Sequence, residues 1–262
     1  RGDLYLLAVG VNDFPSLPKD TNLLFAASDA EEMLQALKQS GAGYYRKVHT
    51  RLINDNTSEK PTRSAILEAL RFVERAEAAD TVVIFLASHG ISDVAGNYYF
   101  VPRDAVPADL ERLEKGGEIE SLIPWTAFFD AYRRTAGRRL LIVDTCQARN
   151  MEGRFESHSL MKRSSASQFA LMLASKGNEE SQEYPDAKHG LFTYALLKAL
   201  ADGKDSDLDG FLSQTEWFDA AQRTVNRLVS KEVGPQTPQL VAPPPLRDLP
   251  VARVGKVFAP PL

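Results

Sequence analysis

Short apolar runs alternate with amphipathic stretches along most of this chain. Uncharged runs such as 81–87 and 140–143, bounded by polar or charged residues, are typical of strands buried on both faces of a parallel sheet. The stretches between them place apolar residues three and four apart, the spacing of a helix with one buried face. We predict strands at 4–11, 47–53, 81–87, 140–143, 169–174 and 236–241, and helices at 28–39, 62–78, 121–135, 190–200 and 216–229. This alternation predicts an α/β fold, a three-layer sandwich around a mostly parallel sheet.

Local signals refine the ends of these elements. Ser28, with Glu31 three residues later, predicts a capping box at the start of the first helix. Pro124 suits the first turn of the helix at 121–135, and 97–102 predicts a short hairpin arm. Polar segments without periodicity predict loops at 103–120, 147–167 and 175–188. The loop at 147–167 is long for a connection inside a compact domain, which is typical of a functional or mobile segment.

Length and composition narrow the classes of protein. The 262 residues fit one large domain, which we place at 1–246, followed by a proline-containing tail at 247–262. A net charge of −4, without basic runs that include aromatic residues, argues against a nucleic-acid partner. No apolar stretch approaches the roughly 18 residues of a membrane span, and one cysteine cannot form an internal disulfide, so we expect a cytoplasmic protein. Because the first predicted strand begins almost at the start of the chain, we expect a domain that is fused to further domains. We also expect the protein to be a monomer.

Two predicted strands end in residues that carry chemistry. The only cysteine, Cys146, comes just after the run 140–143, and His89 follows the strand at 81–87. Chemistry in open α/β sheets gathers outside the carboxyl ends of the strands, and a nucleophile needs a base that the fold places beside it. We therefore interpret Cys146 as a nucleophile and His89 as its base. The alternatives are an inert buried cysteine and a surface histidine, although Gly90 argues against the latter because a glycine lets substrate approach the backbone.

The stretch LASHG at 86–90, with its histidine 57 residues (146 − 89) before the cysteine of VDTCQA at 143–148, resembles caspase-like cysteine peptidases. The nearest groups are metacaspases and bacterial orthocaspases, and the resemblance extends from LYLLAVGVNDF to HGLFTYALLKAL and QTPQLV. It implies a caspase-like sheet of six strands in the order 2-1-3-4-5-6, with the last strand antiparallel. It also implies an endopeptidase with a Cys146–His89 dyad and the backbone N–H groups of Gly90 and Cys146 as the oxyanion hole. No third catalytic residue is evident, and the chemistry requires no cofactor.

The resemblance also implies an acidic specificity pocket. In metacaspases, the acid two residues before the nucleophile lines the pocket for the residue preceding the cut, and here it is Asp144. A second pocket acid follows the pattern C-x-x-D-x-x-x-M, in which Asp29 and Met33 match but Ala26 replaces the cysteine; Ala87 also replaces a serine two residues before the histidine. Two carboxylates favour protein or peptide substrates with Arg or Lys at the cleavage site. The alternatives are a helix-start residue at 29 and a turn residue at 144.

The predicted loop after the nucleophile is basic. It carries Arg149, Arg154, Lys162 and Arg163. Because the resemblance implies cleavage after basic residues, we expect self-processing at one of these four positions. The alternative is an ordinary solvated loop that carries charged residues and is not cleaved.

The stretch DSDLDGFLSQTE at 205–216 fits the calcium-loop pattern D-x-D-x-D-G-x5-E at every position. The candidate ligands are Asp205, Asp207, Asp209, the carbonyl of Phe211, Ser213 directly or through water, and Glu216, with Gly210 at the sharp turn. Gly203-Lys204 interrupts the entering helix and there is no second loop, so an acidic surface turn that caps the next helix is the alternative. The resemblance does not place calcium here, because metacaspases bind it through acids elsewhere in their fold.

Two other functions remain open. A caspase-like fold without activity could serve as a binding or scaffold module, but such a module would lack the histidine or the cysteine, and both are present. Another Cys–His hydrolase, acting on small amides, is disfavoured because the chain has no glycine-rich nucleophile elbow and carries a long basic loop. We therefore expect a proteolytic enzyme.

Overall fold

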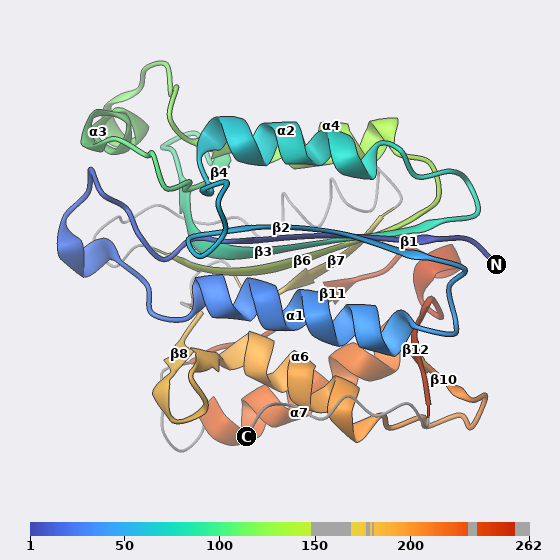
Figure 1. The fold of residues 1–262 in the computed structure, drawn as a ribbon. Helices are drawn as coiled ribbons and strands as arrows, with labels where there is room; N and C mark the ends of the chain where they lie inside the picture. Colours follow the sequence, from blue (N-terminus) through green and yellow to red (C-terminus); the bar gives the residue numbers. More distant parts are fainter. Residues whose placement is uncertain (148–168, 177–178, 180, 230–234, 255–262) are drawn as a thin grey trace.

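The structure is a computed structural model that describes residues 1–147, 169–176, 179, 181–229 and 235–254. A central sheet lies between two helical layers (Figure 1). Six strands lie side by side in the order β2-β1-β3-β6-β7-β11. They are β1 Leu4–Gly10, β2 Val48–Asn54, β3 Thr81–Ser92, β6 Arg138–Gln147, β7 Ala170–Leu173 and β11 Gln239–Val241. All neighbours are parallel except β11 on β7. The predicted fold, with its order 2-1-3-4-5-6 and antiparallel last strand, is confirmed.

The helices cover both faces of the sheet. α1 (Ala26–Gly41), α6 (Leu191–Asp202) and α7 (Gln214–Val229) lie on one side, and α2 (Arg63–Val73) and α4 (Trp125–Arg134) on the other (Figure 1). Alternate residues of β3 enter the two cores, Phe85 on the α1 side and Ile84 on the α2 side. All twelve residues of β3 are buried, which explains why the sequence at 82–87 is an unbroken apolar run rather than an alternating one.

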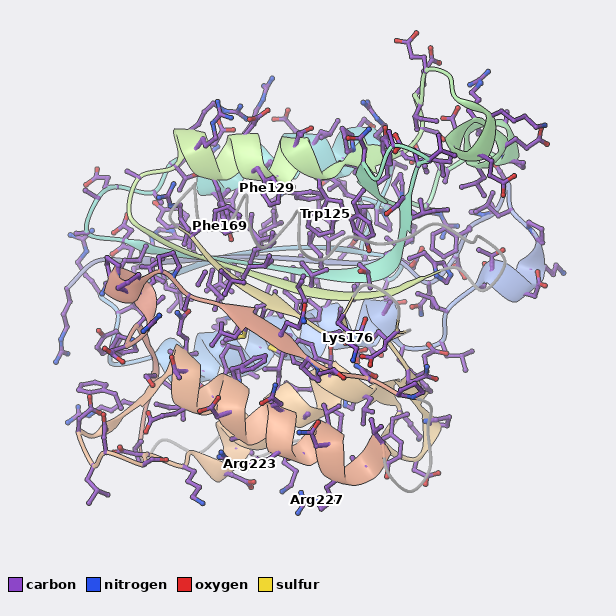
Figure 2. The ribbon with its side chains drawn as sticks, turned by 180° about the vertical axis from the view of Figure 1, so that it is seen from behind. Trp125, Phe129, Phe169, Lys176, Arg223 and Arg227 are labelled. Carbon is purple, nitrogen blue, oxygen red and sulfur yellow. The ribbon has the colours of Figure 1, made fainter. Side chains whose placement is uncertain are left out.

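Aromatic side chains fill the layer beneath α4. Figure 2 labels Trp125, Phe129 and Phe169, which lie between this helix and the sheet. The rings of Phe129 and Phe169 are 5.3 Å apart, and those of Trp125 and Phe129 are 6.4 Å apart. These separations are in the range of favourable tilted aromatic pairs, so the cluster anchors α4 on the sheet.

The predicted hairpin arm exists and extends the sheet. β4 (Tyr98–Phe100) turns back antiparallel to the end of β3 and pairs on its other side with β5 (Ile123–Pro124), which makes a sheet of eight strands. Because of this arm, β3 continues to Ser92, five residues beyond the predicted end at 87. His89 is therefore held within a strand rather than in a loop.

Two local predictions are wrong. Ser28 does not cap α1, which begins at Ala26; the Ser28 hydroxyl donates instead to the carbonyl of Phe25. Side chains from outside the helix accept hydrogen bonds from the N–H groups at its start. The Asn12 side chain accepts the N–H of Ala27, and the Glu183 carboxylate accepts those of residues 24 and 25. Tertiary contacts thus replace the local capping box.

The segment 103–120 is not all loop. It contains α3 (Pro107–Lys115), whose buried residues are only Asp109 and Leu113, so its sequence has little helical periodicity. Thr62 caps α2 by accepting the N–H of Ala65, whereas Pro124 precedes the first turn of α4.

The C-terminal residues also differ from expectation. Part of the expected proline-containing tail at 247–262 is a strand: β12 (Pro250–Arg253) pairs antiparallel with β10 (Phe211–Ser213), and Val251 and Ala252 are buried in the core beside α1. The Tyr45 hydroxyl donates to the carbonyl of Pro250. Residues 255–262 lie outside the described residues, and the domain boundary at 246 stays a prediction.

The remaining elements are short. β8 (Glu183–Tyr184) and β9 (His189–Gly190) form a two-stranded ribbon, and 3-10 turns occur at Lys19–Thr21, Pro185–Ala187 and Pro244–Leu246. Among the helices that the structure describes, none has the length and apolar character needed to cross a membrane.

Candidate active site

The sheet brings the two candidate catalytic positions together. β3 and β6 are parallel neighbours, and their register pairs His89 with Cys146 and Gly90 with Gln147. Both residues lie at the carboxyl ends of their strands, where open α/β sheets carry their chemistry. His89 is 7% exposed, so its ring is largely shielded from water. The strand pairing thus joins two positions that are 57 residues apart (146 − 89) in the sequence.

A backbone carbonyl orients the imidazole of His89. Its Nε2 lies 2.6 Å from the carbonyl oxygen of Thr21, and the ring of Phe14 packs 5.2 Å away between centroids. Since a carbonyl only accepts hydrogen bonds, Nε2 must carry the hydrogen, and in the neutral ring Nδ1 then holds the lone pair. Thr21 is a residue of the candidate site that the sequence did not reveal, because every residue has a carbonyl group and no side-chain signal marks this one.

Gly90 is required by packing. A Cβ at this position would collide with the hydroxyl of Tyr98. That hydroxyl is 2.7 Å from Oγ1 of Thr145, the residue directly before Cys146, and the Tyr98 ring stacks on Trp125. Any side chain at position 90 would therefore disturb the strand that carries the cysteine. This reason for a glycine is separate from the substrate approach that we expected.

The two predicted pocket acids meet in one place. Asp29 from α1 and Asp144 from β6 line a small pocket. Its wall also includes Ala26 and Ala87, the two positions at which the sequence departs from the metacaspase pattern, together with Leu23, Ser181, Gln182, Glu183 and Gly190. The departures therefore place two methyl groups in this pocket and leave its two carboxylates unchanged.

Asp144 is a buried, fully engaged carboxylate. Its Oδ1 accepts a 2.5 Å hydrogen bond from the hydroxyl of Ser181, and its Oδ2 accepts bonds from both the hydroxyl and the N–H of Thr193. Burial raises the pKa of Asp144, although these three hydrogen bonds and the charge of His189 oppose the rise. The interpretation of this residue as a strand-end turn residue is wrong, because its side chain joins three separate segments.

Asp29 is paired with a histidine that the sequence analysis did not single out. Asp29 Oδ1 lies 2.5 Å from Nδ1 of His189, and Oδ2 accepts the N–H of Gly190. Burial raises the pKa of Asp29 to about 7, with a further rise from the nearby charge of Asp144, while the hydrogen bonds to His189 and Gly190 lower it. His189 is also partly buried, which disfavours its charge, but its hydrogen bonds to Asp29 and Glu32 raise its pKa to about 9.

The four candidate positions for self-processing lie in the segment 148–168. Arg149, Arg154, Lys162 and Arg163 lie outside the described residues, so self-processing stays a prediction.

The acidic loop after α6 is compact. One oxygen from each of Asp205, Asp207 and Asp209 lies within 4.8 Å of the others. Gly210 has a φ of +88° at the predicted turn, and Glu216 accepts the N–H groups of Ser206 and Ser213. The strand of this loop, β10, begins at Phe211 and pairs with β12 rather than with a second loop. Clustered oxygens are the donors that calcium prefers, so the three aspartates fit the ion, and calcium binding stays a prediction.

Comparison with known proteins agrees with this geometry. A protein of known structure, GSU0716 from Geobacter sulfurreducens, shares the fold with a TM-score of 0.59 at 15% identity, covering 98% of this chain and 100% of that one. Raptor from Chaetomium thermophilum matches 76% of this chain and 18% of its own at 12% identity, but its TM-score of 0.38 is too low to carry an argument. No curated relative matches the chain. Residues 5–250 match the family model of the caspase domain, peptidase C14, and the chain therefore belongs to the caspase-domain family.

Proposed function

We propose that this domain is a cysteine endopeptidase that cleaves proteins after Arg or Lys. The observation that carries the proposal is the pairing of His89 with Cys146 at the carboxyl ends of two neighbouring parallel strands. A thiol nucleophile and an oriented imidazole at adjacent positions form the minimal pair for acyl transfer. The Thr21 carbonyl supplies the orienting group that fixes the base.

The reaction uses these groups in two halves. Cys146 transfers its proton to His89 and its sulfur attacks the scissile carbonyl carbon, while the N–H groups of Gly90 and Cys146 donate to the oxyanion. The carbon–nitrogen bond then breaks as His89 returns the proton to the leaving amine. Water attacks the resulting thioester, His89 accepts its proton, and the thiol is released with a hydrogen restored.

The pocket supports the preference for basic residues. Asp29 and Asp144 line the same small cavity, and no Lys or Arg is among its described lining residues. A guanidinium or ammonium group can pair with such carboxylates, whereas a substrate aspartate would meet like charge. The same preference would direct self-processing to the basic segment that follows Cys146 in the sequence.

Peptide cleavage tests the proposal directly. We expect turnover of fluorogenic peptides with Arg or Lys before the cut and none of matched peptides with Asp there. Cys146→Ala and His89→Ala should each abolish turnover, and their thermal unfolding should stay close to that of the parent protein. Efficient cleavage of the Asp peptide and none of the Arg peptide would refute the specificity.

Covalent labelling separates the alternatives. A peptide-Arg electrophile should attach to Cys146. His89→Ala should slow that attachment, because the thiol loses the base that converts it to the reactive thiolate. Complete lack of labelling would favour a catalytically silent scaffold module. Hydrolysis of small Arg amides without any cleavage of peptides or proteins would favour a small-amide hydrolase.

A further inference from the structure

The dipeptide His189–Gly190 lies beside the acidic pocket: Gly190 lines it, and His189 contacts its Asp29. It makes up β9, which pairs with β8 close to the start of α1 (Figure 1). The imidazole lies between two carboxylates of α1, with Nδ1 2.5 Å from Asp29 and Nε2 3.3 Å from Glu32. The side chain is 13% exposed. A histidine placed in this way is a fixed cation at the edge of the pocket.

Gly190 leaves open the space between the two pocket acids. A Cβ there would lie 2.8 Å from Oδ2 of Asp144 and 3.2 Å from Oδ2 of Asp29. Its φ of −61° is ordinary for any residue, so glycine is needed for space and not for backbone conformation. A side chain at this position would press against both carboxylates from one side.

We propose that His189 is a specificity-determining residue of this pocket, a built-in cation that keeps the buried Asp29 ionised so that it can receive a substrate Arg or Lys. Gly190 completes the arrangement by keeping the gap between Asp29 and Asp144 free for the substrate cation. This inference rests on the proposed cleavage after basic residues.

The balance of charges in the pocket is the physical reason for this role of His189. Two carboxylates in one shielded pocket cannot both stay ionised without a counter-charge. With His189 protonated, the pair Asp29–His189 is neutral, Asp144 is held by hydroxyl and amide donors, and an entering substrate cation balances the remaining charge. Without that imidazolium, Asp29 would take up a proton, and binding a basic residue would require its release.

The surroundings of His189 hold its charge. The titratable groups on the described elements around it include Asp29 and Glu32 on α1, Asp144 on β6, Glu183 and Tyr184 on β8, and Tyr194, Lys198 and Asp202 on α6, and Lys188 directly precedes the histidine. Two of the acids, Asp29 and Glu32, lie 2.5 Å and 3.3 Å from the imidazole nitrogens and stabilise its charge directly. No basic residue is among the described residues that line the pocket.

The test is the pH dependence of KM in His189→Gln, which keeps a hydrogen-bond donor but removes the charge. An opposite charge at this distance shifts a carboxyl pKa by about 1–3 units. Starting from about 7 for Asp29, a rise of about one unit increases KM for an Arg peptide at pH 7.5 roughly threefold, and about two units roughly 25-fold. This increase in KM should become smaller as the pH rises, and kcat should change less than KM.

Two variants make the result specific. His189→Lys should restore much of the parent pH profile because it restores a cation, whereas His49→Gln, on the outer strand β2, should leave KM unchanged. Gly190→Ala should raise KM at every pH, since its methyl group occupies the gap. An unchanged KM profile in His189→Gln would overturn the inference, provided that the parent protein cleaves Arg peptides. Absence of Arg cleavage in the parent would instead refute the proposed function.

A second measurement needs no activity. In Cys146→Ala, the imidazole ¹⁵N signals of His189 should show a protonated ring up to about pH 9, and Asp29→Asn should lower that midpoint. A midpoint near the ordinary histidine value of about 6.5 would overturn the inference whatever the peptidase does.

Discussion

Asp144→Asn should separate substrate recognition from folding in this protein. The substitution removes a charge and keeps the shape of the side chain. Its carbonyl oxygen can accept both the N–H and the hydroxyl of Thr193, and its amide can donate to the hydroxyl oxygen of Ser181, which now accepts. Every hydrogen bond of the buried carboxylate thus has a counterpart in the amide.

Activity and stability should therefore change in opposite directions. A hydrogen bond to a charged group contributes about 1.5–3 kcal/mol, and each 1.4 kcal/mol is about tenfold, so kcat/KM for Arg peptides should fall roughly 10- to 150-fold. Burial raises the pKa of Asp144, which means that its ionised form costs folding free energy at neutral pH. The free energy of unfolding of Asp144→Asn should then equal or exceed that of the parent.

The assays are peptide kinetics and urea unfolding at pH 7.5. Asp130→Asn is a matched control, because this half-exposed aspartate on α4 pairs with Arg133 and lies on the opposite face of the sheet. It should leave kcat/KM unchanged. The reasoning fails if Asp144→Asn keeps Arg cleavage within threefold of the parent, or if its activity falls only because the protein unfolds at lower urea.

Three further predictions concern pH, calcium and processing. Because the pKa of Asp29 is raised to about 7, KM for Arg peptides should rise as the pH falls below about 7, and a flat KM down to pH 5.5 would contradict a role for its carboxylate. Calorimetric titration of metal-free protein should show calcium binding that Glu216→Gln weakens; no heat at millimolar calcium, or the same heat in the variant, would remove the site. Active protein should generate new termini after one of the four basic residues between 149 and 163, mapped by mass spectrometry, and an intact chain under conditions of full peptide turnover would exclude self-processing.

The sheet could be predicted because its signal is local. The strand at 81–87 is buried on both faces, so burial alone fixes its composition. α3 was missed because it buries only two residues, one of them Asp109, whose carboxylate accepts the N–H groups of residues 120 and 121. The start of α1 was misplaced because its capping groups come from distant segments.

The two catalytic positions could be predicted from the ends of two apolar runs, whereas the two pocket acids came from the resemblance. The structure places each pair together. Thr21 could not be found, since it acts through a carbonyl group 68 residues from His89. His189 could not be assigned a role either, because its partner Asp29 is 160 residues away and only the folded chain brings the two together.

The separation of Asp29 and His189 along the chain sets the earliest time during synthesis at which the pocket can be complete. A ribosome adds about 5–20 residues per second, so His189 emerges roughly 8–30 seconds after Asp29, which lies 160 positions earlier. Ser181 and Thr193, which hold Asp144, are made in the same late interval. A growing chain that already carries His89 and Cys146 therefore still lacks the residues that complete the acidic pocket.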